Sequence, residues 1–147
     1  MGKRPSSVLF ACSFNAIRSP MAEALLKHWQ GRHIFVDSVG VRAAPIDPFA
    51  VQVMEEIGID LRRHRPKSFD DLEDTSFDLV ISLSPEAQHR AVELTRVMAC
   101  EVEFWPIFDP TAVEGAREEI VAAYRMVRDS LRRRIRERFP LQRSDVG

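Results

Sequence analysis

One short segment of the sequence combines the residue types needed to bind and attack an oxyanion. It reads Cys12-Ser13-Phe14-Asn15-Ala16-Ile17-Arg18-Ser19. A loop of this length that leads into a helix can aim successive backbone N–H groups at one point, where the helix dipole adds positive potential. Arg18 can donate two parallel hydrogen bonds to the same anion, which a lysine cannot reproduce. We therefore predict that residues 13–18 form a phosphate-binding loop and that Arg18→Lys is harmful.

Cys12 is the candidate nucleophile of this segment. The thiolate is the reactive form of cysteine, and a helix N-terminus beside a cation favours it. The Ser19 hydroxyl can donate a hydrogen bond to the sulfur, both when it attacks and when it leaves. Asn15 tolerates left-handed backbone angles and is suited to shaping the curl of the loop. A small buried cysteine at a strand end is the alternative, but the spacing of Cys12, Arg18 and Ser19 favours chemistry.

Asp109 is the candidate acid. A phosphate ester departs readily only when its leaving oxygen is protonated, so a second group must face the nucleophile. Asp109 lies in Pro106-Ile107-Phe108-Asp109-Pro110, where two prolines and two apolar residues could hold it partly desolvated. An Asp-Pro pair is also a common start of a turn, so a structural role stays open.

Strands and helices alternate along the chain in an order that would bring these residues together. Apolar runs predict strands at residues 8–11, 34–39, 77–83 and 100–105. Helices are expected to start at Ser19-Pro20, Asp47-Pro48 and Ser84-Pro85, each a capping residue followed by proline. We expect the second helix to end at Gly58 and the third at about Val97, and we expect a long helix over 115–139.

This alternation predicts an α/β fold whose parallel sheet is covered by helices on both faces. Ligands of such sheets bind at the carboxyl ends of the strands. That edge is expected to hold Cys12, Ser38, Ser84 and Asp109.

Composition limits the possible partners. The 147 residues predict one domain over 1–147, and 21 Lys+Arg against 22 Asp+Glu give a net charge of -1. Nucleic-acid or membrane binding is therefore not expected from overall charge, and any anion site must be local. Two cysteines, Cys12 and Cys100, predict no disulfide framework and favour the cytoplasm. The N-terminal apolar run is too short for a signal peptide, and no histidine cluster suggests a metal or cofactor.

The last predicted helix is rich in arginine, from Arg125 to Arg138. These side chains could bind nucleic acid or an acidic partner. Because they alternate with an apolar stripe, and because cations are favourable near a helix C-terminus, we prefer a solvated helix face.

On these residues the chain resembles the low-molecular-weight protein tyrosine phosphatases and the related thioredoxin-coupled arsenate reductases. The resemblance runs along the whole chain and is carried by residues 8–10, 12–19, 20–23, 37–40, 58–59, 64–67, 77–80 and 109–110. It implies a four-stranded parallel sheet and metal-free hydrolysis of phosphomonoesters through a phosphocysteine intermediate. By similarity, Cys12 is the nucleophile, Arg18 the phosphate clamp, Ser19 the thiolate donor and Asp109 the general acid and then base. Asn15, Ser38 and His64 would brace the loop.

Several positions depart from the family pattern. Phe14 stands where glycine is usual, and Ile17 replaces a second cysteine that protects the nucleophile in many members. The aromatic residues that flank the site in phosphotyrosine-selective members are replaced by Thr111 and Ala112 and by residues 42–44, and Ser84 replaces an aspartate.

The sequence therefore predicts a monomeric phosphatase that acts on phosphorylated protein, first on phosphotyrosine, or on small aryl phosphates, and that phosphate or other oxyanions inhibit. Two alternatives remain open. A non-enzymatic phosphate or phosphopeptide-binding module would keep the loop without needing Asp109. An arsenate reductase-like enzyme would need further thiols near Cys12, and Cys100 is predicted at the far end of the sheet.

Overall fold

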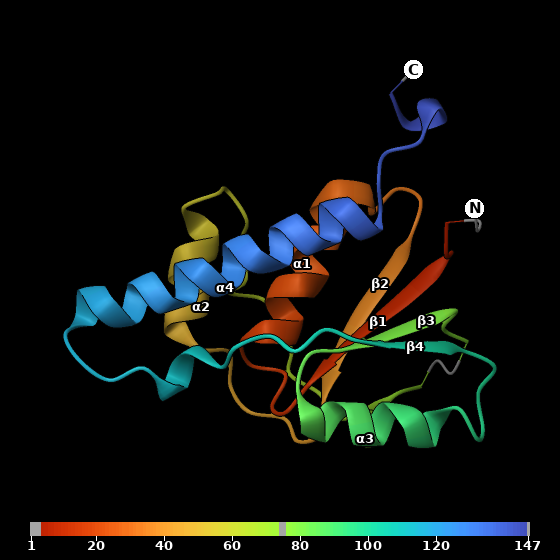
Figure 1. The fold of residues 1–147 in the computed structure, drawn as a ribbon, viewed down its shortest axis with the longest axis horizontal. Coiled ribbons are helices and arrows are strands. Elements are labelled where there is room, and N and C mark those ends of the chain that lie inside the picture. The colour runs from red at the N-terminus through yellow and green to blue at the C-terminus, as the bar shows by residue number, and fades with distance from the viewer. Residues whose placement is uncertain (1–3, 74–75, 147) are drawn as a thin grey trace.

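Four parallel strands form the centre of the fold, in the order β2-β1-β3-β4 (Figure 1). The computed structural model describes residues 4–73 and 76–146 of the chain. The strands are β1 (Ser7–Cys12), β2 (Phe35–Gly40), β3 (Leu79–Ser82) and β4 (Glu101–Phe104). Each lies within a residue or two of the predicted strand, and the predicted α/β class is confirmed.

Helices cover both faces of the sheet. Figure 1 shows α1 (Arg18–Gln30), α2 (Pro48–Glu55) and α4 (Arg117–Arg138) on one side and α3 (Pro85–Leu94) on the other. Short 3-10 turns lie at η1 (Phe69–Asp71), η2 (Pro110–Ala112) and η3 (Arg143–Asp145). A parallel sheet with both faces covered needs strands that are apolar throughout, and all six residues of β1 are buried.

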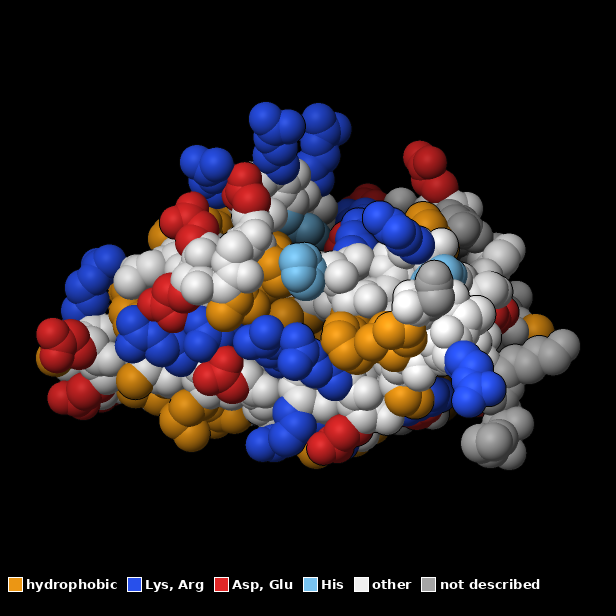
Figure 2. Space-filling view, turned by 90° about the horizontal axis from the view of Figure 1, so that it is seen from above, with side chains coloured by type: hydrophobic (Ala, Val, Ile, Leu, Met, Phe, Trp, Pro, Cys, Tyr) orange, Lys and Arg blue, Asp and Glu red, His pale blue; other side chains and the backbone are white. Residues whose placement is uncertain are grey.

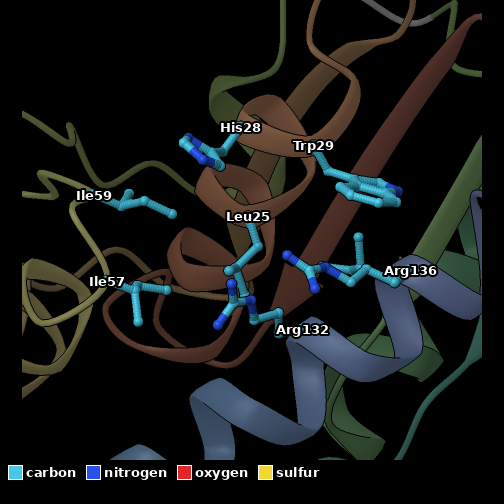
Figure 3. A pocket seen from close by; sticks show the side chains of 8 residues that line it. Leu25, His28, Trp29, Ile57, Ile59, Arg132 and Arg136 are labelled. Carbon is cyan, nitrogen blue, oxygen red and sulfur yellow. The ribbon is translucent and has the colours of Figure 1, made fainter. Parts of the chain in front are cut away.

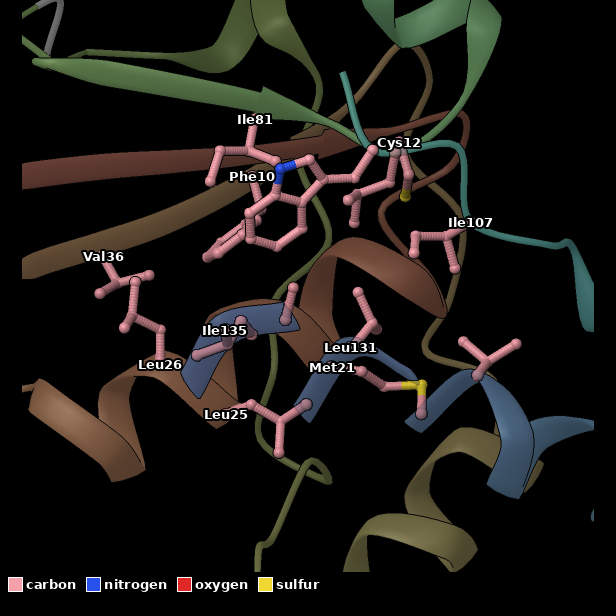
Figure 4. Close-up of a cluster of buried hydrophobic side chains, with 14 of the residues drawn as sticks. Phe10, Cys12, Met21, Leu25, Leu26, Val36, Ile81, Ile107, Leu131 and Ile135 are labelled. Atoms are coloured by element: carbon pink, nitrogen blue, oxygen red, sulfur yellow. The ribbon is translucent and has the colours of Figure 1, made fainter. Parts of the chain in front are cut away.

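Successive residues of β1 point to opposite faces and so join two separate cores. Phe10 and Cys12 belong to the larger core, which is filled from α1, α2 and α4, whereas Leu9 and Ala11 belong to the smaller core beneath α3. Figure 4 shows Phe10 and Cys12 among the side chains of the larger core. The ring centroids of Phe10 and Trp105 lie 6.1 Å apart in this core. Cys12 is therefore part of the larger core.

Two helix starts agree with the predictions and one does not. Asp47 caps α2 and Ser84 caps α3, each followed by a proline in the first turn. The prediction that Ser19 caps the first helix is wrong, because α1 already begins at Arg18 and has no side-chain cap. The Ser19 hydroxyl is engaged instead by Cys12 and Asn15.

Helix ends were predicted less well than helix starts. Helix α2 ends at Glu55, and Gly58 adopts its positive φ of 79° in the turn that follows. Helix α3 ends at Leu94 rather than near Val97.

No residue of the described chain lies in a helix both long and apolar enough to cross a membrane.

The arginines of α4 are mostly engaged by neighbours. Figure 2 shows basic side chains interleaved with acidic and apolar ones on the face above α4. Arg125 and Arg128 both pair with Glu56, and Arg138 pairs with Glu103. Arg136 lies over the ring of Trp29 beside a small pocket of about 30 Å³ between α1 and α4 (Figure 3). These ion pairs and ring contacts are compatible with the predicted role of the α4 arginines as a solvated helix face.

Candidate active site

The backbone of residues 13–17 curls from the end of β1 into the start of α1. The segment 41–47 donates hydrogen bonds of 2.9–3.1 Å to three carbonyl groups of this loop, those of Ser13, Phe14 and Ala16, and to that of Cys12 just before it, so these carbonyls are turned outward. Within the described chain, the N–H groups of residues 13–17 donate to no protein acceptor. They are therefore available to an oxyanion at the helix N-terminus.

Asn15 holds the curl together from inside. It is fully buried and has the one positive φ, 55°, among the non-glycine residues described. Its Nδ2 group donates to Ser19 Oγ and Ser38 Oγ, both at 2.9 Å. Its Oδ1 accepts from the backbone N–H of Lys67 and meets Nε2 of His64, both at 3.0 Å. Ser38 and His64 thus contact the loop through Asn15, where the resemblance placed them.

Gly40 allows β2 to approach the loop closely. A Cβ atom added there would lie 2.5 Å from Asn15 N and 2.6 Å from Phe14 C. Such distances are far inside van der Waals contact, so a side chain at Gly40 would push the loop away.

The thiol of Cys12 is 2 % exposed, and its sulfur lies 2.8 Å from Ser19 Oγ. Because Asn15 donates to Ser19 Oγ, that oxygen already serves as an acceptor. Its own proton can then be directed at the Cys12 sulfur or at Val39 O, which is farther away at 3.3 Å. Ser19 can therefore donate a hydrogen bond to the Cys12 sulfur.

Arg18 is held from behind by two carbonyl groups. Its Nη1 donates to Ile107 O at 3.0 Å and lies 3.5 Å from Leu83 O. The side chain is nevertheless part of the same pocket wall as Cys12. A guanidinium has five N–H donors in one plane, so the contacts of Nη1 leave other donors for an anion.

Asp109 is both a turn residue and a pocket residue. Its Oδ1 accepts from the backbone N–H of Thr111 at 3.0 Å and from the hydroxyl of Thr111 at 2.7 Å. These bonds cap η2 and fix the carboxylate at the pocket. The predicted shielding is only partial, because Ile107 is buried but Phe108 is 54 % exposed.

A pocket of about 90 Å³ is lined by Cys12, Phe14, Ala16, Ile17, Arg18, Asp109 and Thr111. Three of the four predicted catalytic residues therefore share it, and the fourth, Ser19, lies behind Cys12 and contacts its sulfur. Other predicted positions lie outside it. Ser13 turns its hydroxyl to Ser84 Oγ at 3.1 Å, and Ser38 and His64 stay behind the loop. In the described part of the chain, no group of three or more His, Cys, Asp or Glu side chains is arranged to hold a metal ion.

Cys100 lies at the opposite edge of the sheet, as predicted. The register pairs Val8 with Leu79 and Leu79 with Glu101, so Cys100 precedes this row and Cys12 lies beyond it. At about 3.3 Å per strand residue, the two cysteines are roughly 16 Å apart along the strands. A disulfide needs Cα atoms within about 7 Å, so this fold cannot join them.

The surroundings of His64 favour its neutral form. Burial is the main cause that lowers its pKa below the usual 6.5; the charge of Lys67 acts in the same direction, and Glu23 opposes it. An amide oxygen only accepts, and Lys67 N–H also donates to Asn15 Oδ1, so Nε2 of His64 carries the proton that this oxygen receives. Lys67 and Glu23 are supporting residues that sequence reasoning did not single out.

Protonation of His64 is therefore expected to destabilise the folded protein. Because the folded pKa lies below the unfolded value of 6.5, the unfolded chain binds more protons in that window, and stability falls as pH decreases through it. We expect the melting temperature of the parent to fall more steeply below about pH 6.5 than that of His64→Gln, whose amide can still donate to Asn15. Thermal unfolding from acidic to neutral pH checks this; parallel curves would contradict it.

The fold and the site together define a class of protein. A buried cysteine ends the first parallel strand, a loop of free amides leads to an arginine, and an aspartate closes the same pocket. This is the arrangement of cysteine-based enzymes that act on phosphate or a similar oxyanion.

The chain belongs to the low molecular weight phosphotyrosine protein phosphatase family, whose model matches residues 7–140. It is 32% identical over 130 residues to an arsenate reductase of Bacillus subtilis, with 88% of this chain and 92% of that protein covered. A solved arsenate reductase in the phosphate-binding state is similar with a TM-score of 0.70 and 26% identity, over 90% of this chain and 95% of that one. The YwlE arginine phosphatase of Geobacillus stearothermophilus has a TM-score of 0.71 and 27% identity, over 89% and 88%.

Proposed function

We propose that this protein hydrolyses phosphomonoesters, with phosphotyrosine in proteins as the first substrate class. The observation that carries the proposal is the single pocket shared by Cys12, Arg18 and Asp109. The free amides of residues 13–17 support it, and so does the phosphate-bound state of a similar enzyme. Inorganic phosphate is accordingly expected to inhibit by competing for the loop.

The first step transfers the phosphoryl group to the enzyme. The Cys12 thiolate attacks phosphorus, while the loop amides and Arg18 bind the equatorial oxygens, where negative charge is spread. The bond to the leaving oxygen breaks, and protonated Asp109 gives its proton to that oxygen. The products of this step are the free alcohol or phenol, phosphocysteine and an ionised Asp109.

The second step releases phosphate. Asp109 now accepts a proton from water, and the oxygen of that water attacks phosphorus and expels the Cys12 thiolate. Ser19 donates to the departing sulfur from 2.8 Å. Asp109 regains its proton, so the enzyme returns to its starting state.

Arg18→Lys tests the clamp. Lysine keeps the positive charge but loses the planar pair of donors and the fixed position given by Ile107 O. We expect kcat/KM for p-nitrophenyl phosphate to fall by about 10²-fold or more. Steady-state kinetics beside a thermal melt separates this loss from misfolding, and an unchanged kcat/KM in a folded variant would rule out the bidentate role.

Arsenate reduction is the second candidate, which relatives with that name favour. After Cys12 attacks arsenate, reduction to arsenite needs two electrons from thiols. Cys100 cannot reach Cys12 in this fold, so an external thiol would have to supply them. Arsenate-dependent oxidation of glutathione or reduced thioredoxin tests this activity directly, and an assay without such oxidation would argue against arsenate reduction with these thiols.

A further inference from the structure

Phe14 places an aromatic ring on the wall of the active-site pocket. It lines the pocket together with Cys12, Arg18 and Asp109, and 47 % of it is exposed. The backbone at residue 14 has no positive φ, so a side chain is accepted there without strain. Among the residues lining this pocket, Phe14 is the one aromatic residue.

The ring is braced from the outside. The guanidinium of Arg42 lies over it at 5.2 Å from the ring centroid. Arg42 is fixed in turn by Glu86, with both carboxylate oxygens at 2.9 Å from Nη2, and by its backbone N–H, which donates to Ser13 O at 2.9 Å. Arg42 is not part of the pocket wall. Phe14 therefore contacts the Arg42 guanidinium and lines the pocket that also holds Cys12.

The pocket lining also includes the small polar pair Asp109 and Thr111. These two residues bond to each other, whereas the apolar side chains of Ala16 and Ile17 complete the pocket near the loop. Phe14 is therefore the largest apolar side chain in the lining of this pocket.

We propose that Phe14 is a specificity-determining residue, whose ring packs against the aryl ring of the substrate. The proposal rests on the phosphatase function given above and deepens it by favouring aryl phosphates. A guanidinium leaving group, as in phosphoarginine, would need carboxylate or carbonyl acceptors, and Asp109 is the one carboxylate on the pocket wall. An alkyl group has no flat face to match the ring. Aromatic pairs gain binding beyond the area that they bury.

The test compares the binding of two phosphonates. Each has a P–C bond in place of the ester bond of a phosphomonoester, so a phosphatase does not hydrolyse it. Phenylphosphonate and methylphosphonate both present a phosphonate group to the loop, so the ratio of their dissociation constants measures the preference for an aryl group, and the change of this ratio in a Phe14 variant reports on the ring of Phe14. We expect the parent to bind phenylphosphonate more tightly in isothermal titration calorimetry. Phe14→Leu should reduce this preference by roughly three- to tenfold, whereas Phe14→Tyr should retain it.

Two further arms make the result decisive. Arg42→Gln changes an exposed residue that braces the ring, and it should reduce the preference by less than Phe14→Leu does. Failure of the parent to prefer phenylphosphonate would overturn the proposal, and so would an unchanged ratio in Phe14→Leu or faster turnover of phosphoarginine than of phosphotyrosine. Binding needs no turnover. A parent that prefers phenylphosphonate but hydrolyses nothing would therefore reject the phosphatase function and still support the packing of the Phe14 ring against an aryl group.

Discussion

Cys12→Ser is expected to lower kcat for p-nitrophenyl phosphate by at least about 10³-fold. A serine hydroxyl is almost un-ionised at neutral pH and lacks the thiolate character on which the attack depends. The substitution is nearly isosteric at a position that is 2 % exposed, so the fold should hold. Steady-state kinetics with EDTA present measures the loss without interference from contaminating metal-dependent phosphatases.

The matched control for this variant is binding of inorganic phosphate. The loop amides belong to the backbone and Arg18 is unchanged, so Cys12→Ser should still bind phosphate in calorimetry. Retained hydrolysis in Cys12→Ser would exclude Cys12 as the nucleophile. A parent that binds phosphate but hydrolyses no ester would instead identify a phosphate-binding module.

Asp109→Asn is expected to have an effect that depends on the leaving group. For phenyl phosphate, whose leaving oxygen is basic, loss of the proton donor should reduce kcat/KM by about 10²- to 10⁴-fold. For p-nitrophenyl phosphate, whose phenolate leaves without help, kcat/KM should change much less. Asparagine still offers Oδ1 to Thr111, so the cap of η2 at 3.0 Å can persist.

A series of aryl phosphates with leaving groups of increasing basicity measures this effect. The Asp109→Asn variant should show a steeper dependence of log kcat/KM on leaving-group basicity than the parent. Asp109→Ala, which removes the cap as well, separates the two roles through its melting temperature. The same loss for every ester would assign Asp109 to the turn rather than to proton transfer.

Much of the site could be predicted because it is local in the chain. Residues 12–19 carry the candidate nucleophile, the amides and the arginine in one segment, and the strand before them is buried throughout. The starts of α2 and α3 were equally readable, since Asp47 and Ser84 each cap the turn that follows them. Hydrogen bonds of this kind join residues that are close in the chain, so the order of the residues predicts them.

The missed features depend on contacts between distant segments. Ser19 looked like a helix cap, but Asn15 and Cys12 engage its hydroxyl, and the helix begins one residue earlier. Lys67 reaches Asn15 across 52 residues through a backbone N–H that no side-chain type reveals. The sequence shows a glycine at position 40, but it does not indicate that the backbone there lies against the loop. A lone histidine carries no spacing signal, so only the family resemblance indicated a role for His64.

The most direct test of a phosphocysteine mechanism is to trap the intermediate. Asp109→Asn should form it readily from p-nitrophenyl phosphate, whose leaving group needs no acid, and should break it down slowly for want of a base. Rapid acid quenching followed by peptide mass spectrometry is expected to find one phosphoryl group on the peptide that contains Cys12, and none in a double variant that also carries Cys12→Ala, which has no side-chain nucleophile at that position. Steady product release with no phosphoryl group on Cys12, or with the group on another residue, would contradict the account.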